Sequence, residues 1–175
     1  MRCITIAIFS LLLTACGNKK KETRPVQAEA RTIHLPYAPR QTADFEMGNP
    51  AFTKVVLDVW RGFDRGNISG LKAQFAQQLT IMLPDQYLQG NRDTVLAQWQ
   101  KKRDAYTTVQ TMVDSWVPLH ASDTKENFVF VWGKRQLTEP GGKVLHRTIL
   151  EKWRVNGQGL IDFMQQYVNE SYDAN

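Results

Sequence analysis

Residues 127 to 168 read NFVFVWGKRQLTEPGGKVLHRTILEKWRVNGQGLIDFMQQYV. Two turn signals, Glu139-Pro140-Gly141-Gly142 and Asn156-Gly157-Gln158-Gly159, interrupt a stretch in which side-chain character alternates with a period of two. A period of two in side-chain polarity, interrupted by turns that contain Gly and Pro, is typical of antiparallel strands joined by hairpins. The same period begins earlier, after Thr107. We therefore expect a meander of four strands, over residues 107–121, 127–138, 143–155 and 160–168.

The residues ahead of this meander carry helical signals. Asn49-Pro50 has the composition of a helix start, and Gly66 is a natural stop. A short second helix is expected to carry Ile68, Leu71 and Phe75, followed by a strand over residues 80–84, and Asn91 is expected to cap a third helix. Helices first and an antiparallel meander afterwards predict an α+β fold, in which a curved sheet packs on about three N-terminal helices as a cone-shaped roll.

Both faces of the expected sheet are apolar. When the strands are paired across four-residue turns, one face carries Phe128, Phe130, Trp132, Ile149, Trp153 and Met164, and the other carries Val129, Val131, Leu137, Val144, Leu150, Phe163 and Tyr167. Because three helices cover one face only, the second face is left as an apolar patch that favours a partner. We expect a homodimer through the sheet; the alternative is a cover formed by the tether or the C-terminal tail.

Two stretches of the chain resemble one known superfamily. They are Trp60–Asn67 (WRGFDRGN), which continues into LKAQFA at 71–76, and Trp153–Ile161 (WRVNGQGLI), which runs on to Gln166-Tyr167. The resemblance covers about residues 52–168 and is to the nuclear transport factor 2 (NTF2)-like superfamily, which includes SnoaL-like proteins and ketosteroid isomerase. It implies a helix-lined cone closed by a curved sheet, commonly dimeric, with an apolar interior. It implies no activity, because the fold hosts enzymes, ligand carriers and adaptors.

The resemblance also allows isomerase chemistry to be checked by position. That chemistry requires a carboxylate base, together with a phenol and a neutral carboxylic acid that donate to the enolate oxygen. The resemblance places the phenol at Val59, the base at Leu83 and the acid at Glu151, so only the acid is present. Isomerase chemistry of that design is therefore not expected. The expected pocket residues are Val59, Phe63, Leu83, Phe130, Trp132, Glu151, Trp153 and Met164.

Glu151 is the strongest candidate for chemistry in the interior. It could donate to a ligand oxygen, or it could form an ion pair with Arg147 on the same face. Asp162 is the next interior acid. Two classes of function stay open: a non-catalytic module that binds an apolar small molecule in the cone or a protein on the sheet, and an acid–base enzyme (isomerase, dehydratase or hydrolase) that uses Glu151. The three His residues are too scattered for a metal site, and no cofactor motif is present.

The first residues indicate export and a lipid anchor. Met1-Arg2 precedes an apolar run from Ile4 to Leu13, which is too short to span a membrane. The sequence LTACG at 13–17 resembles a bacterial lipobox, with Cys16 as the lipidated residue; the alternative is an ordinary secretory signal. We expect a signal peptide at 1–15, a lipidated tether at 16–48, the domain at 49–170 and a tail at 171–175. The expected location is the cell envelope, lipid-anchored to the outer membrane and facing the periplasm.

Cysteine content and charge narrow the function further. The chain has two cysteines, Cys3 and Cys16. Removal of the signal and lipidation would consume both, which excludes thiol catalysis and disulfides in the domain. From Asn49 onward there are fifteen Lys and Arg against thirteen Asp and Glu, a difference of two. Such a small excess, without a basic stripe, argues against nucleic acid as a partner.

Overall fold

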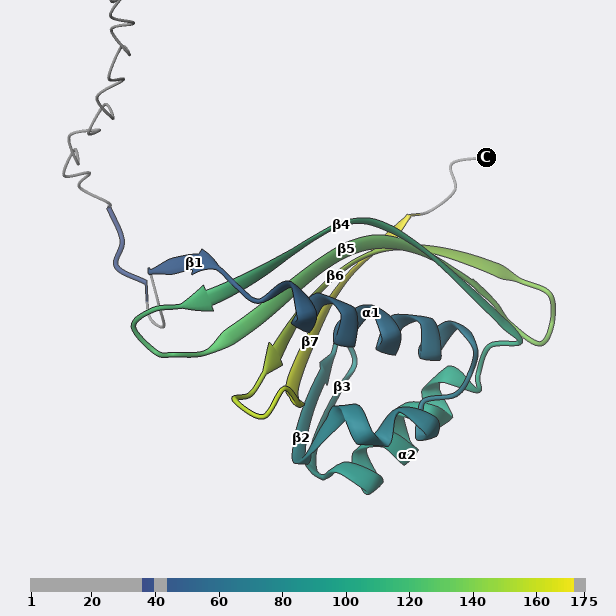
Figure 1. The fold of residues 1–175 in the computed structure, drawn as a ribbon. Helices are drawn as coiled ribbons and strands as arrows, with labels where there is room; N and C mark the ends of the chain where they lie inside the picture. Colours follow the sequence, from purple (N-terminus) through teal and green to yellow (C-terminus); the bar gives the residue numbers. More distant parts are fainter. Residues whose placement is uncertain (1–35, 40–43, 172–175) are drawn as a thin grey trace, which may run out of the picture. The chain divides into compact units, whose positions relative to one another are not determined.

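The computed structural model describes residues 36–39 and 44–171 (Figure 1). The expected signal peptide at 1–15, Cys16 and most of the tether lie outside the described residues. The chain divides into two compact units, Met1–Ala38 and Pro39–Asn175, and the second unit carries the fold. Among the residues described, no helix is both long enough and apolar enough to span a bilayer.

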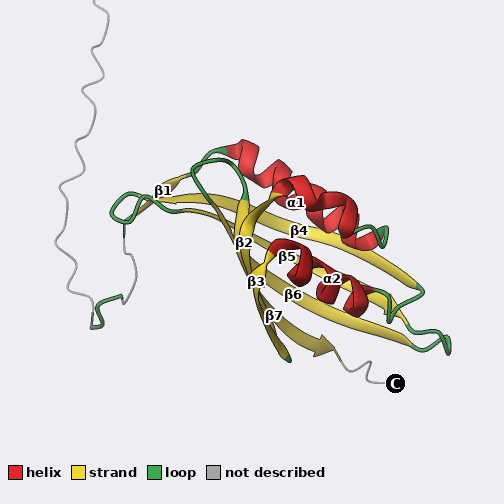
Figure 2. Cartoon of the chain, turned by 90° about the horizontal axis from the view of Figure 1, so that it is seen from below, coloured by secondary structure: helices red, strands yellow, loops and turns green. Residues whose placement is uncertain are grey.

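The second unit is an α+β fold with one curved, unclosed sheet, as the sequence predicted. Its elements are β1 (Phe45–Met47), α1 (Pro50–Asp64), the 3-10 helix η1 (Ser69–Gln74), β2 (Phe75–Leu83), β3 (Gln86–Asn91), α2 (Arg92–Arg103), β4 (Thr108–Ala121), β5 (Asn127–Thr138), β6 (Val144–Val155) and β7 (Ile161–Ser171). The sheet has the strand order β1-β4-β5-β6-β7-β2-β3, and all neighbours are antiparallel except β2 and β7. It arches over α1 and α2, which lie on its concave side (Figures 1 and 2).

The helix boundaries follow from local chemistry. The side chain of Asn49 accepts from the N–H of Ala51 over 2.9 Å, and Pro50 occupies the first helical position, where its missing N–H costs nothing. The chain leaves α1 through Gly66, whose φ of 69° is in the left-handed region that favours glycine. Asn91 caps α2 in the same way as Asn49 caps α1, by accepting from the N–H of Asp93. All three signals are confirmed.

The region between the helices contains more strand than the sequence indicated. The strand expected over 80–84 begins at Phe75, which was expected on a helix and is instead a fully buried strand residue. Strand β3 was not predicted. It lies at the edge of the sheet and buries only Leu88, so its sequence carries almost no apolar alternation.

The register of β5 differs from the prediction by one residue. Thr138 pairs with Val144, so the hairpin connection has five residues, 139–143, and not four. A shift of one residue turns every side chain of a strand to the opposite face. The side chains of Val129, Val131 and Leu137 therefore face the helices and are buried. The expectation that Phe128, Phe130 and Trp132 face the interior is wrong: they lie on the convex face. The predicted faces of β6 are correct, and so are those of Phe163, Met164 and Tyr167 on β7.

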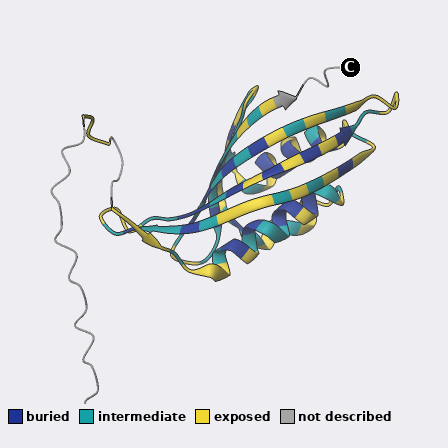
Figure 3. Cartoon of the chain, turned by 90° about the horizontal axis from the view of Figure 1, so that it is seen from above, coloured by how far each residue is buried: buried dark blue, intermediate teal, exposed yellow. Residues whose placement is uncertain are grey.

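The core lies between the concave face of the sheet and the two helices, and exposure alternates along the long strands (Figure 3). Gly133 permits the closest approach between the layers. A Cβ at Gly133 would lie 2.6 Å from the carbonyl oxygen of Met112 and 2.9 Å from the Trp60 ring. Glycine at this position therefore lets the Trp60 indole of α1 pack directly against β5.

Candidate functional site

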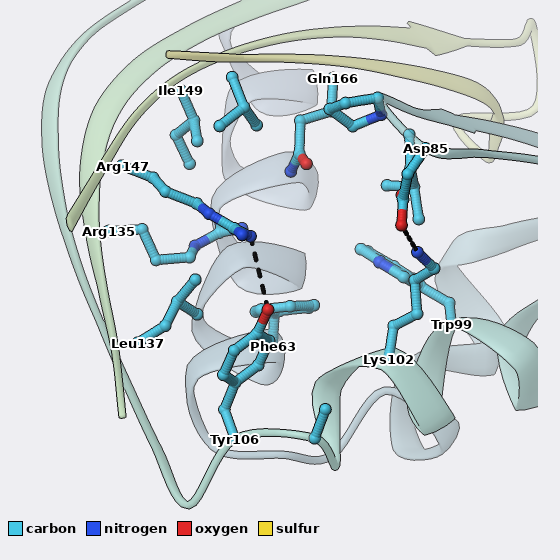
Figure 4. Close-up of a pocket in the computed structure, with 14 residues that line it drawn as sticks. Phe63, Asp85, Trp99, Lys102, Tyr106, Arg135, Leu137, Arg147, Ile149 and Gln166 are labelled. Atoms are coloured by element: carbon cyan, nitrogen blue, oxygen red, sulfur yellow. Dashed lines mark hydrogen bonds and ion pairs between the residues drawn. The ribbon is translucent and has the colours of Figure 1, made fainter. Parts of the chain in front are cut away.

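A cavity of about 490 Å³ opens between the helices and the concave face of the sheet (Figure 4). Its lining residues are Phe63, Leu83, Pro84, Asp85, Trp99, Lys102, Ala105, Tyr106, Arg135, Leu137, Arg147, Ile149, Gln166 and Val168. Small-molecule sites have volumes of roughly 300–1,000 Å³ and mostly apolar walls with a few polar groups. The volume of this cavity lies in that range, and eight of its fourteen lining residues are apolar.

The apolar wall is built from α1, α2 and the central strands. Phe63 of α1 and Trp99 of α2 are in ring contact, with centroids 5.6 Å apart. The Trp99 ring also contacts the ring of Trp153 on β6, with centroids 6.3 Å apart. Because Trp99 and Phe63 are both buried and held by other rings, this part of the cavity is pre-formed.

Glu151 lies beneath the cavity and is 1 % exposed. Its Oε2 accepts from Nε1 of Trp60 over 2.5 Å and from Nε1 of Trp153 over 3.1 Å. Its Oε1 accepts from Nε2 of Gln166 over 2.6 Å and lies 3.8 Å from Nη1 of Arg135. All four partners are donors, which suits a carboxylate, since a carboxylate only accepts. The acid is thus enclosed by α1, β5, β6 and β7.

Arg135 is the buried cation of the site, and its side chain is 5 % exposed. Its guanidinium carbon lies 4.5 Å from the ring centre of Phe63 and 5.2 Å from that of Trp60, and its Nε donates to Thr111 Oγ1. Burial lowers the pKa of Arg135 below its usual range, while the negative charge of Glu151 raises it. The buried ion pair and the two rings together hold the guanidinium at the cavity wall.

An ion pair lies on one side of the cavity (Figure 4). Nζ of Lys102, on α2, lies 2.5 Å from Oδ2 of Asp85, which precedes β3. This hydrogen bond lowers the pKa of the Asp85 carboxyl below its ordinary value. The Asp85 side chain is largely exposed, so water screens the pair and its contribution to stability is small.

The opposite side of the cavity carries a phenol and a second guanidinium. Nη1 of Arg147, on β6, lies 3.5 Å from the hydroxyl of Tyr106, which follows α2 (Figure 4). Tyr106 is held by Arg103, whose Nη1 donates to the Tyr106 carbonyl over 2.7 Å. The same guanidinium donates to the carbonyls of Phe63 and Asp64 at the end of α1, where a cation is favoured by the helix dipole.

The expected pocket residues do not lie together in the structure. Phe63 and Leu83 line the cavity, whereas Val59, Glu151, Trp153 and Met164 are buried in the core and do not. Phe130 and Trp132 lie on the convex face, with their rings stacked at 6.3 Å. Asp162 is not an interior acid: its Oδ1 accepts from Nε of Arg154 over 2.8 Å at the surface. The ion-pair partner of Glu151 is Arg135, where the sequence suggested Arg147.

Five polar residues of the cavity lining were not among the expected pocket residues: Asp85, Lys102, Tyr106, Arg135 and Gln166. Arg135 was missed because the one-residue error in β5 turned it outward. Lys102 and Tyr106 were not singled out, because helical spacing from Asn91 gives both residues a place in the expected third helix. Tyr106 in fact follows α2, and its hydroxyl reaches Arg147 of β6 across the cavity. Among the residues described, no group of three His, Cys, Asp or Glu gathers as a metal site requires.

Comparisons with known proteins identify the fold. No protein-family model matches this sequence, and neither does any curated protein. Among solved structures, the epoxide hydrolase/cyclase-like enzyme SalBIII, from pyran ring formation in salinomycin, is 14 % identical with a TM-score of 0.55, over 68 % of this chain and 91 % of its own. An NTF2-like protein of unknown function from Burkholderia pseudomallei is 16 % identical with a TM-score of 0.55, over 67 % and 90 %.

A third similar structure is RV0760c from Mycobacterium tuberculosis, in complex with estradiol-17beta-hemisuccinate. It is 17 % identical with a TM-score of 0.55, over 69 % of this chain and 97 % of its own. At these identities the likeness establishes the fold alone. The domain has the fold of the NTF2-like superfamily, as the two resembling stretches of the sequence implied.

Proposed function

We propose that this domain is a non-catalytic binding module that holds a small molecule with an apolar body in the cone cavity. The observation that carries this proposal is the enclosure of Glu151. Both oxygens of its carboxylate are occupied by donors, and it does not line the cavity. A general acid or base must come within hydrogen-bond reach of the reacting atom. Glu151 in this arrangement serves the core and not a substrate.

Apolar side chains at the two other positions that isomerase chemistry requires support the same conclusion. Val59, where the resemblance implies a phenol, is fully buried in the core. Leu83, where it implies a base, lines the cavity as an apolar wall. Both residues make the interior drier and less reactive, which favours binding of apolar surface over proton transfer.

The similar structures include both uses of the fold. SalBIII is described as an epoxide hydrolase/cyclase-like enzyme, and RV0760c as a complex with estradiol-17beta-hemisuccinate. The alternative function for this chain is therefore an acid–base enzyme that uses Glu151. For that chemistry, Gln166 and the Trp60 indole would have to release the carboxylate toward the cavity.

Native mass spectrometry of the purified full chain, after exposure to an envelope lipid extract, tests the proposal. We expect an adduct whose mass identifies the ligand. Ala105→Trp fills the cavity wall and should abolish the adduct, whereas Ala97→Trp, on the exposed face of α2, should keep it. Glu151→Gln should retain the adduct. No adduct in any sample would contradict the proposal, and an adduct converted to product by the wild type but not by Glu151→Gln would favour the enzyme.

We also propose that Cys16 carries a lipid anchor and that the domain lies at the outer membrane, facing the periplasm. The support is the short apolar run from Ile4 to Leu13 followed by LTACG. The test is metabolic labelling of the full chain with an alkyne analogue of palmitate in bacterial cells. Labelling and membrane association should be lost in Cys16→Ser. Label on Cys16→Ser, or an unlabelled wild type, would contradict the anchor.

A homodimer through the convex face of the sheet is the third part of the proposal. The large apolar side chains exposed on that face include Met112, Trp132, Val144 and Tyr167, of which Tyr167 is 52 % exposed. Exposed apolar side chains gathered on one face are typical of protein interfaces. The alternative partner is a different protein on the same face, and light scattering of the purified chain separates the two.

A further inference from the structure

The charged side chains of the cavity lining already have partners. Lys102 and Asp85 are bonded to each other, and Arg135 is ion-paired with Glu151 beneath the cavity. Arg147, the remaining charged residue of the lining, is engaged as well. A charged group brought into this cavity would lose its water without finding an unpaired counter-charge, which is costly in free energy. The lining therefore favours a neutral ligand.

The amide of Gln166, on β7, has one bonded atom and one open atom. Its Nε2 donates to Oε1 of Glu151 over 2.6 Å. Among the residues described, no group donates to the Oε1 of Gln166, and this oxygen is not one of the atoms sealed in the core. Figure 4 shows the Gln166 side chain reaching into the cavity that it lines. The amide oxygen is therefore an acceptor that a ligand can reach.

The orientation of this amide follows from the charge of Glu151. An ionised carboxylate only accepts hydrogen bonds, so the nitrogen of the Gln166 amide must face it. If the amide were turned by 180°, its oxygen would lie against the carboxylate oxygen in place of the nitrogen, and two acceptors at that separation repel each other. The indoles of Trp60 and Trp153 hold the other carboxylate oxygen, which fixes the carboxylate itself. The buried acid thus determines which end of the amide the cavity meets.

From this arrangement we infer that the ligand is a neutral apolar alcohol whose hydroxyl group donates to Oε1 of Gln166, and that Glu151 is the positioning residue that turns this acceptor toward the cavity. The inference rests on the proposed binding function and names the class of molecule bound. The apolar body of the alcohol lies along Phe63, Trp99 and Ile149, which line the cavity. A molecule of the same shape without a donor would displace water from the amide oxygen and leave it without a partner.

The test compares two probes with the same aromatic body, pyrenebutanol and its methyl ether, by titration of the purified full chain followed through the pyrene emission. Only the alcohol has a proton to donate. The ether is the more apolar of the two, so burial of apolar surface alone favours the ether. We expect the alcohol to bind about fivefold more tightly than the ether. Pyrenebutanoate, the anion with the same body, should bind less tightly than the alcohol.

Variants of two neighbouring glutamines assign the preference to the cavity. Gln166→Met removes the amide and keeps the length of the side chain, so the preference for the alcohol should fall below about twofold. Gln165→Met makes the same change at the next residue of β7, which lies on the convex face, and should leave the preference unchanged.

Glu151→Gln tests the positioning role. The new amide keeps one oxygen for the two indoles and offers an N–H to Gln166, whose own amide can then turn and present its nitrogen to the cavity. The methyl ether, which only accepts, should therefore bind this variant more tightly than it binds the wild type. The preference for the alcohol should fall below about twofold, although both probes still bind.

The outcomes separate the inference from the proposed function. If the wild type binds the ether as tightly as the alcohol, or the carboxylate more tightly than the alcohol, the inference is overturned and the binding function stands. If no probe binds a chain that remains folded by circular dichroism, both are overturned. If Gln165→Met lowers the preference as much as Gln166→Met, the assignment to this cavity is wrong. A folded Glu151→Gln variant that keeps the full preference overturns the positioning role.

Discussion

The hydrogen bond between Trp60 and Glu151 gives the sharpest test of the interior, through Trp60→Phe. Trp60 is 3 % exposed, and its Nε1 donates to Glu151 Oε2 over 2.5 Å. Phenylalanine keeps an aromatic ring beside Arg135 but has no donor. A hydrogen bond to a charged group contributes about 1.5–3 kcal/mol, and the smaller ring leaves a void that costs about 1 kcal/mol. We expect the free energy of unfolding to fall by roughly 2.5–4 kcal/mol.

Trp132→Phe is the matched control, because it makes the same chemical change on the convex face. Trp132 is 37 % exposed and stacks on Phe130, a contact that phenylalanine can keep. Its free energy of unfolding should change by less than about 1 kcal/mol. Urea denaturation followed by far-ultraviolet circular dichroism measures both variants without depending on tryptophan fluorescence. If Trp60→Phe costs no more than Trp132→Phe, the enclosure of Glu151 by α1 is refuted.

Three further predictions test other parts of the structure. Gly133→Ala should lower the free energy of unfolding by about 1–3 kcal/mol, because the new Cβ would lie 2.6 Å from a backbone oxygen. Gly141→Ala is the control: its Cβ would have no atom within 4 Å, so the free energy of unfolding should change by less than about 0.5 kcal/mol. Urea denaturation measures both variants. The pKa of Asp85 is lowered in the folded chain, so its pair with Lys102 stabilises above about pH 4 and this contribution is lost as the pH falls through the lowered pKa. The stability difference between wild type and Asp85→Asn, at most about 0.5 kcal/mol at pH 7, should therefore shrink on acidification, and a difference that grows would contradict this sign. Tyr167→Asp should convert a dimer to a monomer in light scattering without changing probe binding, and a variant that stays dimeric would exclude the convex face as the interface.

The elements with strong local signals could be predicted from the sequence. Asn49 and Asn91 act within two residues of their own positions, and Gly66 acts through its own backbone angle, so no knowledge of the rest of the chain is needed. Strand β3 could not be predicted in this way. It exists because it pairs with β2, which is a tertiary contact, and only Leu88 records it in the sequence.

The orientation of β5 shows where sequence patterns become insufficient. One face of this strand carries Phe128, Phe130 and Trp132, and the other carries Val129, Val131 and Leu137. Hydrophobicity does not distinguish the two faces, so the orientation depended entirely on the length of the connection. Lys143, counted as the first residue of the next strand, instead closes the turn by accepting from the N–H of Glu139.

The candidate site was lost through the same error. The interior residues of β5 include Gly133 and Arg135. Taken alone, Gly133 predicts a bend in the strand and Arg135 predicts an exposed cation. Their purpose is visible only in three dimensions, where Gly133 admits the Trp60 ring and Arg135 then stacks on it. Glu151 could be predicted as an interior acid because β6 was oriented correctly. Its partners on α1 and β7 could not.

The enclosure of Glu151 also has a consequence for the order of folding. Its partner Trp60 is 91 residues away in the chain, and Gln166 is 15 residues away on the far side of a hairpin. An ionised carboxylate that leaves water before its partners arrive costs several kcal/mol. Contacts between distant segments form slowly, because loop closure must come first. We therefore expect the central strands to pair first and the last water to leave this carboxylate when α1 docks. Phe63 of α1, which lines the cavity, would arrive in the same step.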